Sequence, residues 1–280
     1  MSFNDSKISE LKTICKDLRK SILMMTNAAK SGHPGGSLSA VELLACLYFG
    51  VLKYDSKNPN WEERDRVVIS KGHSTPLVYS ILAKAGYYKE TDLNTFRRLG
   101  SMFQGHTDRL KVPGVEVSAG SLGHGTSNGV GMALGCRLKG IKNRIYVLQS
   151  DGELQEGSTW EAIMSASHYH LGNLTVLLDR NRIQLDGWTE ETMALEPINK
   201  RYEAFGWNVQ EVNGHDLNEI HNALIKAQEI GESDNKPTVI IAHTTKGKGI
   251  SFMEDQVKYH GVPPTDEEYK KGVEELDSIS

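Results

Sequence analysis

Short apolar runs alternate with longer segments of helical periodicity along most of this sequence, and this alternation restricts its fold more than any other feature. The runs are mostly continuous, as expected for strands that helices cover on both faces of a parallel sheet. Candidate strands lie at residues 65–72, 143–150, 173–181, 208–214 and 237–247, and candidate helices at residues 74–88, 91–100, 126–140, 158–172, 198–207 and 217–230. The pattern predicts a doubly wound α/β fold with a mostly parallel sheet and helices on both faces.

Two further helices are predicted before the first strand. Apolar residues between positions 8 and 29 recur at intervals of three and four, which indicates a long amphipathic helix packed on a core. A Gly-rich stretch at residues 31–37 ends it, and a second helix is expected at residues 38–52. No internal repeat or linker is evident, so residues 1–280 are expected to form one domain, with an irregular tail after about Gly247.

Composition and charge argue against several classes of protein. The formal net charge is −4 with both signs interspersed, so we expect no nucleic-acid partner and no membrane partner. No apolar run approaches the roughly 18–20 residues that span a bilayer, and the N-terminus lacks the apolar core of a secretion signal. Cys15, Cys46 and Cys136 lie far apart in apolar helical patterns, which favours buried thiols in a reducing compartment and a cytoplasmic location.

Polar residues follow two successive candidate strands. Asp151 and Gly152 come after the run at residues 143–150, and Asn181 ends the next run. A single helix joins these strands, so they should be neighbours whose ends meet at one edge of the sheet. With the carbonyl of Ile183, the carboxylate and amide oxygens would supply half of an octahedron for Mg²⁺, which leaves positions for phosphate oxygens and water. A simple turn or cap is the alternative for Asp151 alone.

A second candidate is the Gly-rich stretch at residues 119–135. Gly120, Gly123 and Gly125 precede a predicted helix, where residues without side chains bring backbone N–H groups close to an anion. A Gly-rich loop is weak evidence by itself. Close packing of the helix explains the later glycines without any ligand.

Four histidines lie beside glycine or in loops: His33, His73, His106 and His260. Their spacing forms no zinc motif, and no cysteine accompanies them. Imidazoles in such surroundings suit proton transfer and hydrogen bonding to sugar hydroxyls or phosphate. A single loop histidine is more often structural, whereas four of them indicate a shared site.

Seven segments, taken in order, resemble the diphosphate-binding half of transketolase. They are NAAKSGHPGGSLS, SKGHSTPLVYSIL, GHTDR, AGSLGHGTSNGVGMA, SDGELQEGSTWEA, LDRNRIQLDG and HTTKGKGISFME followed by YHGVPP. The resemblance covers essentially the whole chain and implies the thiamine diphosphate-binding fold, with residues 1–280 as the diphosphate-binding domain. The spacing of Asp151 and Asn181 resembles a motif of a wider thiamine diphosphate superfamily, and only the histidine segments favour transketolase within it.

The resemblance implies roles for individual residues. Asp151, Asn181 and the carbonyl of Ile183 would bind Mg²⁺, for which Ca²⁺ or Mn²⁺ can substitute. The residues implied to bind thiamine diphosphate are His73 and Gly152 at the diphosphate, Gly120 and Leu122 at the rings, and Asp151, Asn181, Glu156 and His260. Glu156 matches a position that pairs across the subunit interface, with a surface-helix carboxylate as its alternative. The implied catalytic residues are His33, His106 and His260, which would line the substrate channel.

This sequence also departs from the family pattern. Ser150 stands where the motif usually has its first glycine, and His124 replaces a residue that is commonly glutamine, so we assign it no role. Family members continue into a pyrimidine-binding domain, which supplies a glutamate for the cofactor, and into a C-terminal domain. This chain ends at Ser280. It therefore resembles the N-terminal subunit of a split transketolase, with the missing domains expected on a partner chain.

With that C-terminal subunit, the resemblance implies transfer of a two-carbon ketol unit from a ketose phosphate to an aldose phosphate. The expected setting is the pentose phosphate pathway and the expected assembly a heterotetramer; the chain alone should be nearly inactive. One alternative is a subunit of another thiamine diphosphate enzyme, similar to 1-deoxyxylulose-5-phosphate synthase or a dehydrogenase E1 component. The other is a non-catalytic cofactor-binding subunit.

Overall fold

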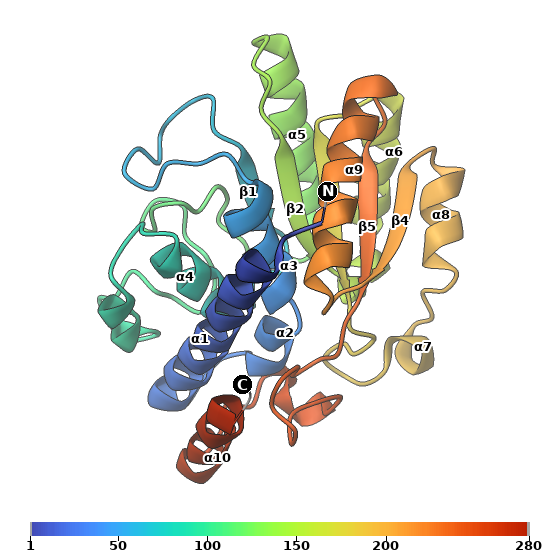
Figure 1. Cartoon of the computed structure of the whole chain (residues 1–280). Helices are drawn as coiled ribbons and strands as arrows, with labels where there is room; N and C mark the ends of the chain where they lie inside the picture. The colour runs from blue at the N-terminus through green and yellow to red at the C-terminus, as the bar shows by residue number, and fades with distance from the viewer. Residues whose placement is uncertain (1, 279–280) are drawn as a thin grey trace.

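A computed structural model describes residues 2–278, and its centre is a five-stranded sheet with helices on both faces (Figure 1). The strands are β1 (Arg66–Ile69), β2 (Ile145–Ser150), β3 (Leu174–Arg180), β4 (Asn208–Asn213) and β5 (Thr238–His243). Their order across the sheet is β1-β2-β3-β5-β4, and every neighbouring pair is parallel. The predicted α/β class is confirmed, and so is the expectation that β2 and β3 are neighbours.

Each face of the sheet carries its own apolar core, because successive residues of a strand point to opposite faces. In β2, Tyr146 and Leu148 belong to one core, and Ile145 and Val147 to the other. The helices over the first core are α1 (Asp5–Ala29), α2 (Pro34–Leu38), α3 (Val41–Cys46), α4 (Thr75–Lys84), α9 (Leu217–Ser233) and α10 (Asp266–Ser278). Those over the second are α5 (His124–Leu138), α6 (Gly157–His168) and α8 (Ile198–Ala204), while α7 (Thr189–Thr192) is a single turn.

The long N-terminal helix is confirmed as α1. Asn4 caps its start by accepting a hydrogen bond from the Lys7 amide at 2.8 Å. Its apolar stripe, which includes Leu11, Leu18 and Ile22, is almost completely buried. Full burial of each such side chain stabilises the fold by about 1.5–3 kcal/mol.

The helix predicted at residues 38–52 is wrong in detail, because three shorter elements replace it. α2 ends at Leu38, α3 covers Val41–Cys46, and a π-helical turn covers Leu47–Val51. The junction between α2 and α3 is tied to the sheet, since the Ser39 hydroxyl donates to the buried Asp179 carboxylate of β3 at 2.6 Å. This contact places the junction directly at the end of β3.

Two other expectations are corrected. The helix predicted at residues 91–100 is only a 3₁₀ turn, Glu90–Thr95, and it cannot continue because Arg97 has a φ of 57°. The tail after Gly247 is not wholly irregular, because α10 covers Asp266–Ser278. α10 is amphipathic, and its Leu276 is buried in the core that α1 covers.

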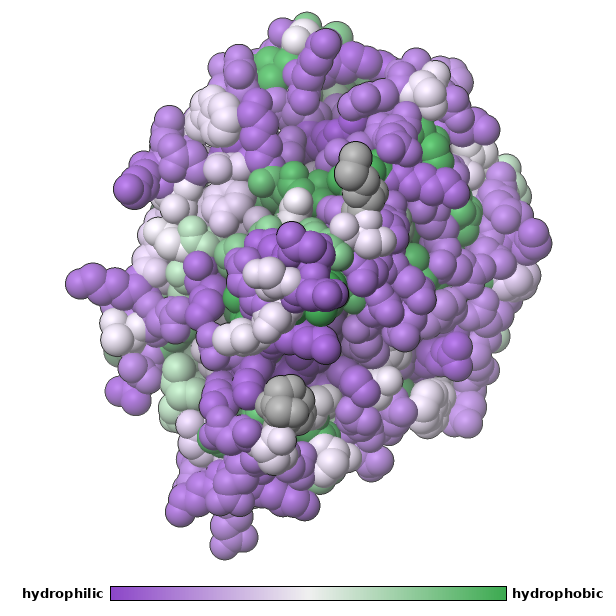
Figure 2. Space-filling view, in the orientation of Figure 1, coloured by the Kyte–Doolittle hydropathy of each residue, from purple (hydrophilic) through white to green (hydrophobic). Residues whose placement is uncertain are grey.

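Among the described residues, one helical stretch is long and apolar enough to cross a membrane, contrary to the sequence-based expectation. It is Pro34–Val51, which contains α2, α3 and the π turn, and 83% of it is buried inside the fold. Burial at this level is typical of a core segment. The face shown in Figure 2 is mostly hydrophilic, with small apolar areas between the polar side chains.

Candidate functional site

Asp151 and Asn181 lie at the same edge of the sheet. β2 and β3 pair with Ser150 opposite Asp179, so both chains leave the sheet at the same level. The Asp151 side chain accepts a hydrogen bond from the backbone amide of Arg182, the residue after Asn181, at 2.6 Å. Both side chains are buried, Asp151 to 1% exposure and Asn181 to 4%. The predicted meeting of these residues at one edge is thus confirmed.

The three groups implied to bind a metal all accept hydrogen bonds within the chain. Asp151 Oδ1 accepts from the Gly152 amide at 2.8 Å, and its Oδ2 also accepts from Arg180 Nη1 at 3.1 Å. Asn181 Oδ1 accepts from the Ile183 amide at 3.1 Å. The Ile183 carbonyl accepts from a lysine ammonium, that of Lys246, at 2.7 Å. A cation therefore already lies against one of these oxygens.

Burial and the nearby Asp179 carboxylate raise the pKa of Asp151, although Arg180 opposes this. Asp179 itself forms a completely buried ion pair with Lys71. Burial alone would raise the pKa of Asp179, but the Lys71 charge together with the hydrogen bonds from Lys71, Ser39 and Thr244 outweighs it, and the pKa is lowered. The edge of the sheet thus holds two carboxylates that differ in their ease of ionisation.

Lys246 is a buried lysine whose hydrogen-bond partners carry no charge. Its ammonium group donates to the Ile183 carbonyl and lies 2.7 Å from His260 Nδ1, both of which are neutral acceptors. Burial, with the Lys71 charge as a further cause, lowers its pKa to about 7. Among residues 2–278, no carboxylate forms a salt bridge with Lys246, so an anion placed beside it would restore its full charge.

His33, His73 and His260 form one cluster. The ring centroids are 5.4 Å apart for His33 and His73, 5.7 Å for His33 and His260, and 5.3 Å for His73 and His260. Burial, and then neighbouring cations, lower the pKa of His33 to about 4 and of His260 to about 3, and that of His73 well below its usual range. All three rings are therefore neutral at physiological pH, and His33 Nδ1 is buried without a hydrogen-bond partner.

Two glycines let this cluster assemble. A Cβ atom on Gly35 would lie 2.8 Å from the Tyr259 carbonyl and 3.2 Å from Lys246 Cγ. A Cβ atom on Gly36 would lie 3.4 Å from His73 Nε2, and the Gly36 carbonyl accepts from Lys71 at 2.7 Å. The HPGG stretch is thus packed against both lysines and His73.

His106 lies apart from the three-ring cluster, on the loop before α5. A Cβ atom on Gly120 would lie 3.6 Å from its ring, so these two implied site residues are in contact range. Burial, and then the charge of Arg97, lower the pKa of His106. The charge of Arg97 also lowers the pKa of His33, so this one cation acts on both histidines.

The Gly-rich loop donates a hydrogen bond to the side chain of Glu153 in the same chain. Glu153 is fully buried and accepts hydrogen bonds from the Gly123 amide at 3.0 Å, from the Ser150 amide at 2.8 Å and from the Ser150 hydroxyl at 2.9 Å, and the Ser70 hydroxyl also donates to it. Burial raises its pKa, and these donors oppose the rise. The Gly123 amide was expected to face a ligand, and it instead donates to Glu153. The bond from the Ser150 hydroxyl to Glu153 gives a structural reason for serine at this position.

The remaining implied residues lie around this loop. A Cβ atom on Gly152 would meet only Gln184 Cβ, at 3.6 Å. There is therefore room for a ligand to approach the backbone of Gly152. Glu156 is exposed. A Cβ atom on Gly123 would lie 2.7 Å from Glu156 Cβ, so the two residues are in close contact. Leu122 is half-buried, and His124 is exposed at the start of α5.

Sequence reasoning missed Lys71, Lys246, Asp179, Arg180 and Glu153. The signal for both lysines was their position, since each lies at the end of a predicted strand, in SKG and in HTTKG. Among the described residues, no group of three or more His, Cys, Asp or Glu side chains is arranged to hold a metal ion. A metal here would rely on the Asp151 carboxylate together with amide and backbone oxygens, whose chemistry suits Mg²⁺ or Ca²⁺.

The site fits a ligand that carries several negative charges and a divalent ion. Oxygens at the ends of β2 and β3 suit the ion, and the under-neutralised Lys246 suits the anion. In a doubly wound fold, this place is where nucleotide-like and diphosphate ligands bind. Fold and site together define a diphosphate-binding α/β domain.

Comparison with known proteins identifies the family. Residues 11–277 match the family model described as "Transketolase, thiamine diphosphate binding domain". The chain belongs to the transketolase family and corresponds to its N-terminal, thiamine diphosphate-binding subunit. The resemblance seen in the sequence is confirmed.

Two similar proteins are subunits of comparable length. The chain is 42% identical over 260 residues to "6-deoxy-6-sulfo-D-fructose transketolase subunit SqwG" of Clostridium sp. (strain MSTE9), covering 93% of this chain and 94% of that one. It is 42% identical over 258 residues to a subunit of the apulose-4-phosphate transketolase of Phocaeicola vulgatus, covering 92% of this chain and 90% of that one.

Solved transketolases share the fold but are longer. The structure of the Pichia stipitis enzyme in complex with sedoheptulose-7-phosphate superposes with a TM-score of 0.91 at 34% identity. The match covers 96% of this chain and 41% of that one. This chain therefore spans about two-fifths of the length of that enzyme, in agreement with a subunit that acts with a partner.

Proposed function

We propose that this chain is the cofactor-anchoring subunit of a two-chain transketolase. With a C-terminal subunit that carries the pyrimidine-binding domain, it transfers a two-carbon ketol unit from a ketose phosphate to an aldose phosphate. The observation that carries the proposal is the meeting of Asp151, Asn181 and Lys246 at one sheet edge. Oxygen ligands for a divalent ion lie there beside a lysine that forms no salt bridge with any carboxylate among the described residues.

The divalent ion, Mg²⁺ with Ca²⁺ or Mn²⁺ as substitutes, is proposed to bind Asp151, Asn181 and the Ile183 carbonyl. Lys246 now donates to that carbonyl at 2.7 Å. Since two cations repel each other at one oxygen, the ammonium group would turn from the carbonyl towards the diphosphate. Metal binding and diphosphate binding would therefore support each other.

His73 and Gly152 are proposed to contact the diphosphate of thiamine diphosphate, and Gly120 and Leu122 its rings. The neutral state of His73 suits this role, because its ring adds no charge beside Lys71 and Lys246. Glu156 is exposed and free to meet another chain at the interface, as its sequence position implies. When bound, thiamine diphosphate supplies the chemistry that cleaves and forms the carbon–carbon bonds.

His33, His106 and His260 are proposed to hold and move protons at the oxygens of the sugar. When Lys246 is protonated it can only donate to His260 Nδ1, which places the ring proton of His260 on Nε2, where it can be donated to a substrate oxygen. His33 is neutral and has an unpartnered buried Nδ1, which suits a hydrogen bond formed only with substrate. Both rings are suited to proton transfer without adding charge to the site.

The partner and the substrates are part of the same proposal. Relatives named as subunits support a second chain, for which a heterotetramer is the expected assembly. Two relatives are named for a sulfonated and a phosphorylated ketose, which supports a donor with an anionic group at its far end. The pentose phosphate pathway as setting and a cytoplasmic location are further proposals; the three free, buried cysteines support the latter.

A ketol-transfer assay of the chain co-expressed with a C-terminal transketolase subunit tests this function. A ketose phosphate donor and an aldose phosphate acceptor should give transfer products that require thiamine diphosphate and Mg²⁺. Activity with pyruvate as donor and none with ketose phosphates would favour a synthase-like or dehydrogenase-like enzyme. Cofactor binding without any turnover would favour the non-catalytic subunit.

A further inference from the structure

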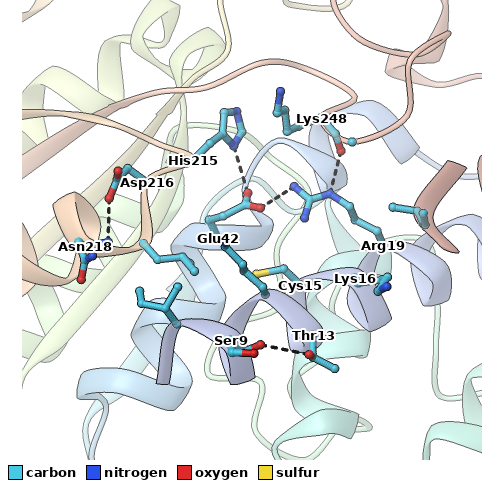
Figure 3. Close-up of a pocket in the computed structure, with 15 residues that line it drawn as sticks. Ser9, Thr13, Cys15, Lys16, Arg19, Glu42, His215, Asp216, Asn218 and Lys248 are labelled. Atoms are coloured by element: carbon cyan, nitrogen blue, oxygen red, sulfur yellow. Dashed lines mark hydrogen bonds and ion pairs between the residues drawn. The ribbon is translucent and has the colours of Figure 1, made fainter. Parts of the chain in front are cut away.

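A second polar cluster, Arg19, Glu42 and His215, lines a cavity of about 550 Å³ between α1 and the start of α9 (Figure 3). Arg19 Nη2 donates to Glu42 Oε1 at 2.7 Å, and His215 Nδ1 lies 3.1 Å from Glu42 Oε2. Arg19 and Glu42 are buried to 7% and 8% exposure. The cluster joins α1, α3 and the loop before α9, three parts of the chain that are far apart in sequence.

Hydrogen bonding fixes the protonation of this cluster. His215 Nε2 accepts a hydrogen bond from the Thr245 amide at 2.8 Å, so the ring proton is on Nδ1 and is donated to Glu42. Burial opposes ionisation of Glu42, but the Arg19 charge and the His215 hydrogen bond outweigh it and its pKa is lowered. Glu42 is therefore a carboxylate that holds Arg19 with one oxygen and His215 with the other.

The two side chains that bond to Glu42 also form hydrogen bonds with the backbone on either side of Lys246. His215 accepts from the Thr245 amide, and Arg19 Nε donates to the Lys248 carbonyl at 2.9 Å. The fit is close, because Gly249 has a φ of +91° and a Cβ atom there would lie 2.6 Å from Arg19 Nε. A third hydrogen bond, from the Gly247 amide to the Gly35 carbonyl at 3.0 Å, also holds the backbone of this segment in place.

We propose that His215 and Arg19, which both bond to the Glu42 carboxylate, position Lys246 and with it His260; this inference rests on the proposed function. None of the three cluster residues is in hydrogen-bond contact with Lys246 or with His260. They act through the backbone of residues 245–248, which sets where the flexible lysine side chain begins. A fixed starting point restricts the conformers of a four-carbon chain, so in the free chain its ammonium group stays between Ile183 and His260, close to where the diphosphate is proposed to bind.

Two substitutions of His215 separate this role from a general contribution to stability. The amide of His215→Asn lies near the place of Nδ1, so it retains a donor for Glu42 and loses the acceptor for Thr245. The longer side chain of His215→Gln places an amide oxygen near the place of Nε2, so it retains the acceptor for Thr245. His215→Asn is the test variant and His215→Gln its matched control.

The first measurement is hydrogen exchange of the purified chain, followed at the Thr245 and Gly247 amides. Losing one hydrogen bond loosens a segment by about fivefold, so exchange there should rise about that much in His215→Asn and much less in His215→Gln. The thermal midpoints of the two variants should be similar. Equal exchange at Thr245 and Gly247 in wild type and His215→Asn would overturn the inference.

The second measurement is calorimetric titration of the chain, assembled with its partner subunit, with thiamine diphosphate in Mg²⁺. The dissociation constant should rise about fivefold or more in His215→Asn and recover in His215→Gln. Unchanged affinity in His215→Asn, despite faster loop exchange, would also overturn the inference. If the wild-type assembly binds no thiamine diphosphate, the proposed function fails, and hydrogen exchange alone then decides whether His215 positions residues 245–248.

Discussion

The Lys246 ammonium group lies 2.7 Å from His260 Nδ1 and 2.7 Å from the Ile183 carbonyl oxygen, and so connects a proposed catalytic residue to a proposed metal ligand. Lys246 follows β5 and Ile183 follows β3, two strands that are neighbours in the sheet. The lysine therefore lies beside the proposed site of the diphosphate. Its own charge state should respond to that ligand.

Binding of thiamine diphosphate at pH 8 should be accompanied by uptake of about one proton. With a pKa of about 7, Lys246 is mostly neutral at pH 8 in the free chain. A neighbouring diphosphate raises that pKa, so the lysine takes up a proton on binding. The uptake should vanish at pH 6, where the lysine is already protonated.

Calorimetry of the assembled enzyme in two buffers of different ionisation enthalpy measures this uptake. Lys246→Met should abolish it at pH 8 and weaken binding. An uptake of the same size in Lys246→Met would show that another group takes the proton.

The histidine cluster should make the chain less stable in mild acid. The unfolded chain protonates His260 near its usual pKa of about 6.5, whereas the folded chain does so only at about 3. Stability is therefore lost as the pH falls below about 6.5, because the unfolded state binds more protons. Between pH 7.5 and pH 5, His260→Gln should lose about 2 kcal/mol less than wild type.

Urea unfolding of the two chains at both pH values gives this difference. A parallel loss of stability in wild type and His260→Gln would mean that the ring titrates normally in the folded chain.

Removal of the Glu153 carboxylate should destabilise the fold strongly. Its buried oxygens accept from Gly123, Ser150 and Ser70, and donors buried without partners are costly. We expect Glu153→Ala to lower the free energy of unfolding by about 3 kcal/mol, and Ser150→Gly, which loses one hydrogen bond, by about 1 kcal/mol. Denaturant unfolding checks both values, and equal effects would contradict the central place of Glu153.

Gly125 should tolerate no side chain, whereas Gly131 in the same helix should. A Cβ atom on Gly125 would lie 2.3 Å from Ser70 Cβ, and one on Gly131 would meet nothing within 4 Å. Overpacking should make Gly125→Ala less stable by about 2 kcal/mol, while Gly131→Ala should gain up to about 1 kcal/mol from helix propensity. Thermal unfolding of the isolated chain compares them, and a neutral Gly125→Ala would show that Ser70 moves aside.

The sheet and the main helices could be predicted because their signals are local. Short apolar runs marked four of the five strands, β4 was marked by the mixed polar and apolar residues 208–213, and the periodic stripe from Ile8 marked α1. The exceptions have tertiary causes. The predicted helix at residues 38–52 is divided because Ser39 bonds to Asp179 on a strand 140 positions away, and no local pattern contains that contact.

For the site, the positions of Asp151 and Asn181 followed from a topological rule, since neighbouring parallel strands end at one edge. Lys71 and Lys246 also follow strands, but lysine is usually exposed and its burial depends on a packed structure. The pairing of Ser150 with Glu153, and of Glu153 with Gly123, required the turn after β2 to fold back under the Gly-rich loop. Composition alone does not indicate such a contact.

The most direct test of a metal-anchored diphosphate is calorimetric titration of the assembled enzyme with thiamine diphosphate, with and without Mg²⁺. Asp151→Asn keeps the shape of the side chain and removes its charge. Its dissociation constant in Mg²⁺ should rise about tenfold or more, and most of the Mg²⁺ dependence should be lost. Wild-type affinity with unchanged Mg²⁺ dependence in Asp151→Asn would contradict the proposed site.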